Sequence, residues 1–318
     1  MNRRQFIATL ASGIVATPVI AGERPKPMPT RKLGRTGIKV PILGFGSGSR
    51  FLMYKDDDEA IAALNHALDL GITYIDTAHS YGDGKSEERV GRVMATRRKE
   101  VVLATKIAAR TADAARKQIE LSLKRLNTDH LDVLHIHNLK NLDDLAAIEA
   151  KGGVLEALYE AREHKLTRAI GITCHASPQA LQTALERHDF DCTQMALNAG
   201  LASITDAMKI APAGPACFEH LALPVAVRKK MGVIAMKVFG QEQLVGAVSA
   251  DKLLAYALSL PVSLASVGMP KPEFIAANAA SARSFRPLSR REREALTDSI
   301  GTERKQAMQR FFRDHEDA

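Results

Sequence analysis

Short apolar runs rich in β-branched residues alternate with longer amphipathic stretches along most of this chain. The short runs have the length and composition of strands, and the stretches between them have the composition and spacing of helices. The predicted strands are Val40–Phe45, Thr73–Thr77, Val101–Ile107, Leu131–His137, Ala169–Thr173, Thr193–Leu197, Gly232–Val238 and Ser263–Val267. The clearest predicted helices are Asp57–Leu70, Ala112–Leu126, Leu145–Glu163 and Pro178–Arg187. Asp57 and Thr111 are expected N-caps, and Gly71 and Gly152 are expected helix ends.

Strands that alternate with helices predict an α/β fold with a parallel sheet. A doubly wound sheet is one alternative, but its dinucleotide fingerprint is missing. The glycines in Gly44-Phe45-Gly46-Ser47-Gly48 follow the first strand without forming GxGxxG at the start of a helix. Eight units closed into a single (β/α)₈ TIM barrel fit better. We expect the charged tail, Leu288–Ala318, to be helical and to pack outside the barrel or over one end.

The first 21 residues differ in character from the rest. Arg3 and Arg4 precede an uncharged stretch, Ile7–Ala21, which is too short and too rich in small residues for a stable membrane anchor. This segment resembles a twin-arginine export signal with a possible cleavage site after Ala21, which predicts a periplasmic protein carried by the twin-arginine machinery. The alternative is an amphipathic or disordered extension, which would leave the protein in the cytoplasm. Residues 22–30 are predicted to be a proline-rich linker, and residues 31–318 the barrel domain.

Composition narrows the function classes only slightly. The 318 residues are 46% hydrophobic and carry a formal net charge of +8, which suits a large core and anionic ligands such as nucleotide phosphates. The chain shows no basic run with interleaved aromatics, so we expect no nucleic-acid binding. The three cysteines, Cys174, Cys192 and Cys217, are too few and too scattered for a disulfide framework and are expected to be buried free thiols.

Four reactive side chains lie near the ends of consecutive predicted strands. Asp76 ends the second strand, Tyr81 follows it in the loop, Lys106 ends the third, and His137 ends the fourth. Asp76, Lys106 and His137 are separated by 30 and 31 residues, about one βα unit each. Because the active site of a β/α barrel lies at the carboxyl ends of its strands, these groups are expected to converge. A lysine that closes an apolar strand also needs a carboxylate partner, and Asp76 can supply one.

The sequences DTAHSYG, ATKI and LHIHN, with the opening KLGRTGIKVPILGFG, resemble the aldo-keto reductase family from Lys32 to Leu296. The resemblance implies an N-terminal hairpin that closes the bottom of the barrel, and a reaction in which NADPH or NADH reduces an aldehyde or ketone to an alcohol. Tyr81 would donate the proton, and the Lys106 ammonium would make the phenol a stronger acid. Asp76 would hold Lys106 in place, and His137 would orient the carbonyl oxygen.

The same resemblance implies a set of cofactor-binding residues. They are Gly46, Thr173, Cys174, Gln194, Met236, Lys237, Gly240, Lys271 and Asn278. Thr173 and Cys174 stand where the family typically has Ser and Asn, and Met236 stands where many members have Tyr. Phe274 replaces the arginine that some members use for a 2′-phosphate. NADPH is favoured by the resemblance, but the choice between NADPH and NADH stays open.

Arg50, Tyr54 and His175 are the candidate substrate-binding residues, and Asn198–Cys217 is expected to form part of the pocket. We expect the protein to be a monomer or a small homo-oligomer. Two alternatives remain. His135 and His137 form an HxH pair that suits a metal-dependent barrel hydrolase, although the resemblance implies no metal. A cofactor-binding sensor or subunit with little turnover would also keep this fold.

Overall fold

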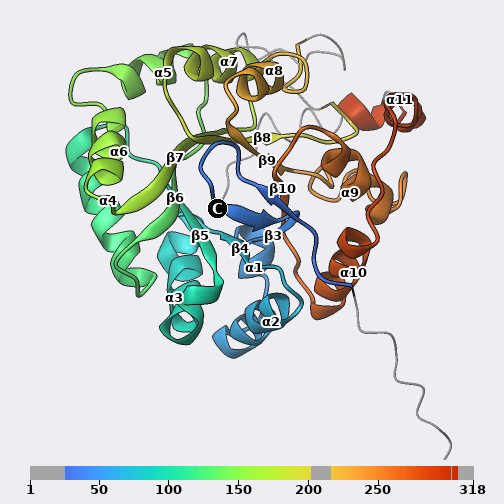
Figure 1. Ribbon diagram of the computed structural model, residues 1–318, viewed down its shortest axis with the longest axis horizontal. Helices are drawn as coiled ribbons and strands as arrows, with labels where there is room; N and C mark the ends of the chain where they lie inside the picture. The colour runs from blue at the N-terminus through green and yellow to red at the C-terminus, as the bar shows by residue number, and fades with distance from the viewer. Residues whose placement is uncertain (1–25, 202–215, 302, 307–318) are drawn as a thin grey trace, which may run out of the picture.

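The computed structural model describes residues 26–201, 216–301 and 303–306. Eight parallel strands form a closed barrel in the order β10-β3-β4-β5-β6-β7-β8-β9, and helices surround it (Figure 1). The barrel strands are β3 (Leu43–Gly46), β4 (Tyr74–Asp76), β5 (Val102–Ile107), β6 (Leu131–Ile136), β7 (Thr167–Cys174), β8 (Cys192–Ala196), β9 (Gly232–Met236) and β10 (Leu264–Val267). The predicted TIM barrel is confirmed, and each predicted strand corresponds to one of these eight.

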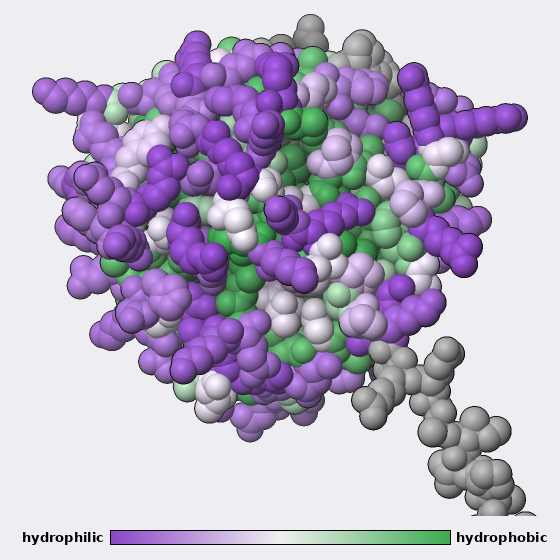
Figure 2. Space-filling model, in the orientation of Figure 1, coloured by the Kyte–Doolittle hydropathy of each residue, from purple (hydrophilic) through white to green (hydrophobic). Residues whose placement is uncertain are grey.

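The helices follow the strands in sequence. They are α1 (Ser49–Leu52), α2 (Asp57–Asp69), α3 (Lys85–Arg97), α4 (Ala112–Arg125), α5 (Leu142–Glu149), α6 (Val154–Glu163), α7 (Pro178–Arg187), α8 (Ala222–Arg228), α9 (Ala250–Ser259), α10 (Pro272–Arg283) and α11 (Arg290–Ser299). The 3₁₀ turns η1 (Tyr81–Gly84) and η2 (Arg98–Glu100) flank α3. Hydrophilic side chains cover most of the face shown in Figure 2, and hydrophobic residues emerge in smaller areas between them. None of the helices described is long and apolar enough to cross a membrane.

Two local predictions need correction. The predicted helix Leu145–Glu163 is two helices, α5 and α6, because the chain turns at Gly152 with a left-handed φ of 73°. The N-cap of α2 is Asp56 rather than Asp57, and its side chain accepts a hydrogen bond from the backbone N–H of Glu59.

The ends of the chain's described region agree with the expected layout. The strands β1 (Thr30–Lys32) and β2 (Lys39–Pro41) form an antiparallel hairpin. Leu33, Ile38 and Val40 of this hairpin region join the apolar cluster inside the barrel. The tail helix α11 lies outside the barrel beside α9, where the backbone N–H of Leu288 donates to Ser259 Oγ at 2.7 Å.

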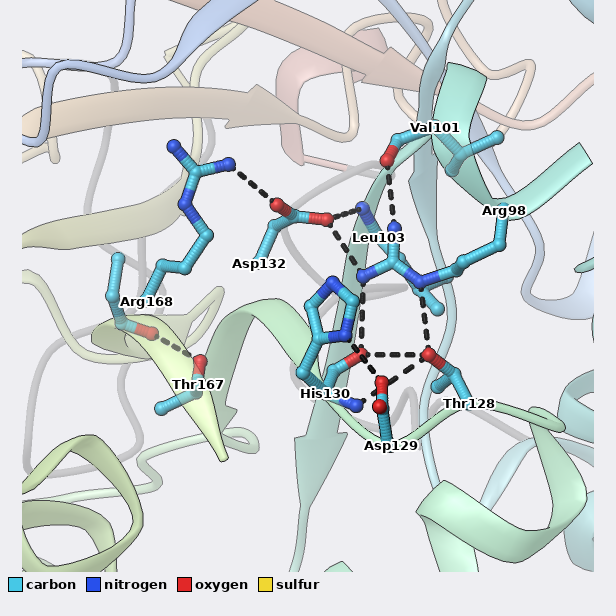
Figure 3. Close-up of polar contacts among 10 residues, drawn as sticks. Arg98, Val101, Leu103, Thr128, Asp129, His130, Asp132, Thr167 and Arg168 are labelled. Atoms are coloured by element: carbon cyan, nitrogen blue, oxygen red, sulfur yellow. Dashed lines mark hydrogen bonds and ion pairs between the residues drawn. The ribbon is translucent and has the colours of Figure 1, made fainter. Parts of the chain in front are cut away.

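A buried carboxylate on β6 joins neighbouring strands near the amino end of the barrel. Asp132 Oδ2 accepts hydrogen bonds from Arg98 Nη2 at 3.0 Å and from the Leu103 backbone N–H at 2.9 Å (Figure 3). Asp132 Oδ1 accepts from Arg168 Nη1 at 2.8 Å. Since these residues come from β5, β6, β7 and the η2 turn, the network links three neighbouring strands at the end opposite the predicted site.

Candidate active site

Four predicted catalytic residues meet at the carboxyl end of the barrel. Lys106 Nζ lies 3.0 Å from Asp76 Oδ1 and donates to Tyr81 Oη at 3.2 Å and to the Thr77 carbonyl at 2.8 Å. The Lys106 side chain is 2% exposed and that of Asp76 is 5% exposed. The buried ammonium therefore has three oxygen partners and one compensating negative charge, which is what a stable buried cation requires.

The alternation of side chains along the strands explains why Asp76 and Lys106 meet. Tyr74, Ala104 and Val133 face the barrel interior, and the alternation of strand side chains carries Asp76 and Lys106 to the same side two residues later. Tyr81 reaches the group from η1, directly after the β4 loop. His137 completes it, since its ring meets the Tyr81 ring edge-on at a centroid distance of 5.5 Å.

Two further residues hold the Asp76 carboxylate, Gln194 on β8 across the barrel and Ser266 on β10, two strands from β4. Asp76 Oδ2 accepts from Gln194 Nε2 at 3.0 Å and lies 3.4 Å from Ser266 Oγ. The sequence prediction assigned Gln194 to the cofactor and did not include Ser266. The signal for Ser266 was a single hydroxyl within an apolar strand, but strand pattern alone does not tell which remote group such a hydroxyl meets.

A cavity of about 120 Å³ opens beside Tyr81 and Asp76. Four predicted cofactor residues line it, Gly46, Gln194, Met236 and Lys237, as does the predicted substrate residue Arg50. Arg50 Nε forms an ion pair with Glu242 Oε1 at 3.3 Å, which joins the β3 and β9 loops at the cavity.

The cavity walls fit a nicotinamide nucleotide. A Cβ on Gly48 would lie 3.3 Å from the Tyr81 ring, so a larger residue there would displace that ring by a few tenths of an ångström. Gln194 Oε1 in the lining and Asn198 Nδ2, two residues beyond the end of β8, are buried and have no hydrogen-bond partner among the described residues. Together they offer the acceptor and the donor that a carboxamide needs. Lys237 adds a cation suited to a phosphate. A bound cofactor would satisfy these groups and supply a hydride.

Other cofactor candidates lie outside this lining. Thr173 Oγ1 accepts from the Asn138 backbone N–H at 2.8 Å, and Cys174 Sγ donates to the Leu139 carbonyl at 3.0 Å. Burial raises the pKa of Cys174 to about 12. Both side chains thus tie β7 to the loop after β6, and their contact with a cofactor stays a prediction.

The remaining candidates do not line the cavity. Gly240 follows β9, Lys271 caps α10, and Asn278 is buried within α10. Tyr54 donates to the Met269 carbonyl at 3.0 Å, and burial, with Glu273 and Glu59 nearby, raises the pKa of Tyr54 to about 12. His175 is buried after β7. Of Asn198–Cys217, residues 202–215 lie outside the described residues.

A second cavity borders His137 on the side of the β5 and β6 loops. Its lining is mostly polar: Ser80, Ala108, Arg110, His137, Asn138, Lys140 and Asp144. Arg110 forms an ion pair with Asp144 at 2.7 Å and donates to the carbonyls of His137 and Asn138. The sequence prediction included only His137 of this wall, because the other residues come from three loops and the start of α5 without regular spacing.

The HxH pair does not form a metal site in the described part of the chain. There, no group of three or more His, Cys, Asp or Glu residues is placed to hold a metal ion. His135 is fully buried, and burial lowers its pKa well below the ordinary value, with further lowering by the charges of Lys106 and His137. A neighbouring ammonium also disfavours a metal cation. The hydrolase alternative therefore has no support in these residues.

Comparison with known proteins identifies the family. The model of the Aldo/keto reductase family matches residues 42–247, well over half of the chain. This chain belongs to that family.

Individual relatives match over shorter stretches. The chain is 39% identical over 153 residues to the aldo-keto reductase YhdN of Bacillus subtilis, covering 43% of this chain and 44% of that protein. It is 35% identical over 157 residues to L-galactose dehydrogenase of Arabidopsis thaliana, covering 45% and 47%. The chain thus spans about half the length of these curated relatives. A solved aldo-keto reductase of Klebsiella pneumoniae in complex with NADPH is 24% identical, covers 86% of this chain and 94% of its own, and has a TM-score of 0.67.

Proposed function

We propose that this protein is an NAD(P)H-dependent carbonyl reductase, which reduces a small aldehyde or ketone to an alcohol. One observation carries the proposal. A buried ammonium, Lys106, lies within 3.2 Å of the Tyr81 hydroxyl and 3.0 Å of Asp76, beside a cavity that fits a nicotinamide. Reducing a carbonyl requires a hydride and a proton, and Tyr81 is placed to supply the proton.

Each residue of the group has a distinct role. Lys106 stabilises negative charge on the Tyr81 oxygen, which makes the phenol a better proton donor. Asp76 keeps Lys106 charged and in place, and Gln194 and Ser266 hold Asp76. His137, whose ring contacts the Tyr81 ring edge-on, orients the carbonyl oxygen. In the reverse direction, the Tyr81 phenolate accepts the alcohol proton.

NADPH is the favoured cofactor. Lys237 in the cavity suits the pyrophosphate that NADPH and NADH share, and the preference for NADPH is supported by the related Klebsiella protein, which was solved with NADPH bound. Phe274 offers no charge to a 2′-phosphate, and Lys271 is the cation nearest to it in sequence. The ratio of kcat/KM for NADPH and NADH tests this choice, and a higher ratio for NADH would reverse it.

The decisive experiment compares the full chain with Tyr81→Phe. Oxidation of NADPH is followed with a panel of apolar and hydroxylated aldehydes and ketones, because the wall beside His137 is polar. We expect turnover by the natural chain, and loss of nearly all turnover in Tyr81→Phe with unchanged NADPH affinity. Equal turnover in both would contradict the proposal. Tight cofactor binding with negligible turnover in the natural chain would favour a sensor or subunit.

We also propose that the protein is exported. Support comes from the sequence alone: Arg3 and Arg4 precede an uncharged, small-residue stretch, and residues 1–25 lie outside the described residues. Fractionation of cells that express the natural chain and Arg3→Lys/Arg4→Lys tests the export, since lysines keep the charge. We expect periplasmic protein only from the natural chain. Light scattering tests the further proposal of a monomer or small homo-oligomer.

A further inference from the structure

The turn that carries Tyr81 has an unusual backbone. Gly82, Asp83 and Gly84 follow Tyr81 with φ values of 57°, 54° and 99°. Gly82 and Gly84 adopt these angles without steric cost, but Asp83 is a non-glycine residue in the left-handed region, which costs free energy that the surroundings must offset. The position of the Tyr81 hydroxyl therefore depends on what fixes this turn.

One side chain holds the turn on both sides of Tyr81. Arg125, the last residue of α4, donates from Nη1 to the His79 carbonyl at 3.2 Å and from Nη2 to the Asp83 carbonyl at 3.1 Å. These carbonyls lie two residues before and two residues after Tyr81. The guanidinium also packs directly over Gly84, where a Cβ would lie 2.1 Å from Arg125 Cζ.

A buried carboxylate compensates the charge of this arginine. Arg125 Nη1 lies 3.5 Å from Glu87 Oε2, and the Glu87 side chain is fully buried. Glu87 Oε1 accepts from Thr105 Oγ1 at 2.7 Å, and Thr105 immediately precedes Lys106 on β5. Burial raises the pKa of Glu87, while hydrogen bonds from Thr105 and the charge of Arg125 oppose that rise. The cluster thus connects the Tyr81 turn to the strand that carries Lys106.

We propose that Arg125 is a positioning residue, which acts from behind the barrel wall and keeps the Tyr81 hydroxyl within hydrogen-bond reach of Lys106. The proposal rests on the proposed role of Tyr81 as proton donor. Arg125 lies between α3 and α4, so it touches neither cavity described above. Only arginine has a planar fork that can donate to two separate carbonyls while facing a carboxylate.

Two variants test the proposal, with Lys124→Met as the matched control, because Lys124 is the exposed neighbour on the same helix. Arg125→Met removes the charge and the fork, and Arg125→Lys keeps the charge opposite Glu87 but loses the fork. We expect kcat to fall on the order of 10²-fold in Arg125→Met, because displacement of a reacting group by about 1 Å costs that much. NADPH affinity and the substrate KM are expected to stay within about twofold, and Lys124→Met to behave as the natural chain.

Chemical rescue measures whether a free guanidinium restores kcat, which separates positioning of Tyr81 from a general loss of stability. Gly91, Arg92, Lys124 and Arg125 line a groove between α3 and α4, and the Arg125 side chain is 18% exposed. Methylguanidinium is therefore expected to restore part of the lost kcat of Arg125→Ala, whereas methylammonium is not. The pH dependence of kcat should also shift in Arg125→Ala and return toward that of the natural chain when methylguanidinium is added.

The results distinguish a wrong role for Arg125 from a wrong proposed function. If Tyr81→Phe is inactive but both Arg125 variants keep kcat within twofold, this inference is wrong and the proposed function stands. If Arg125→Met shows no cooperative thermal unfolding, the kcat of Arg125→Lys is used instead, because this variant keeps the charge opposite Glu87. A kcat within twofold of the natural chain then contradicts the positioning role. A loss of NADPH affinity equal to the loss of kcat would overturn the positioning role. If Tyr81→Phe turns over normally, the proposed function itself fails.

Discussion

Replacing Lys106 by methionine keeps most of the length of the side chain and removes its charge. Asp76 would then remain buried, with Gln194 and Ser266 as its remaining side-chain donors. Two unit charges 3.0 Å apart interact by about 5 kcal/mol at an effective permittivity of about 20. Removing one partner of a buried pair typically costs about 3 to 5 kcal/mol. We therefore expect Lys106→Met to lower the free energy of unfolding by that amount.

A double variant separates this stability effect from catalysis. Asp76→Asn/Lys106→Met replaces both charges, and the new amide oxygen can still accept from Gln194. We expect it to recover most of the lost stability, because no uncompensated charge remains. Turnover should stay on the order of 10² to 10⁴ below that of the natural chain in both variants, because Tyr81 lacks the ammonium that favours proton transfer.

The assays are urea denaturation at equilibrium and steady-state NADPH oxidation with one aldehyde. Turnover of Lys106→Met within tenfold of the natural chain would contradict the role of the ammonium in proton transfer. If the double variant is as unstable as Lys106→Met, the buried charge of Asp76 is not the cause of the lost stability. Circular dichroism of both variants at low temperature checks that the comparison is made on folded protein.

Three other predictions follow from the described contacts. Cys174→Ala should leave NADPH affinity unchanged and lower the free energy of unfolding by about 1 kcal/mol, because the thiol donates to a loop carbonyl. A tenfold weaker NADPH affinity in a titration would instead make Cys174 a cofactor contact. Asp132→Ala should lower the free energy of urea unfolding by about 3 kcal/mol, because two arginines lose their shared partner. Its kcat should not change, because Asp132 lies at the end of the barrel opposite the active site, and a large fall in kcat would contradict this separation. Burial keeps the pKa of His135 well below 6.5, so only the unfolded chain binds a proton there as the pH falls. Below pH 6.5 this group should lower the free energy of unfolding by up to about 1.4 kcal/mol per pH unit. Urea titrations of His135→Gln should show a flatter dependence on pH, and an unchanged dependence would mean that another group causes it.

Local pattern determined the architecture of this protein. Apolar runs and amphipathic stretches predicted each barrel strand, because strand and helix periods are properties of neighbouring residues. The same regularity predicted the meeting of Asp76, Lys106 and His137, since side chains one βα unit apart reach the same end of a closed barrel. The hairpin Thr30–Pro41 and the tail helix α11 were also predictable, the hairpin from a family resemblance and the helix from composition.

Contacts between distant segments were decided only by the tertiary structure. Gln194 and Ser266 bond Asp76 across 118 and 190 residues of chain, and no local pattern encodes such a pairing. The bond from the Cys174 thiol to the loop after β6 is a second example, because the direction of a side chain at a strand end depends on the neighbouring loop. Arg125 was one of many helical arginines in the sequence. Only the folded chain brings its guanidinium over Gly84, because the partners of a buried charge are set by packing and not by sequence distance.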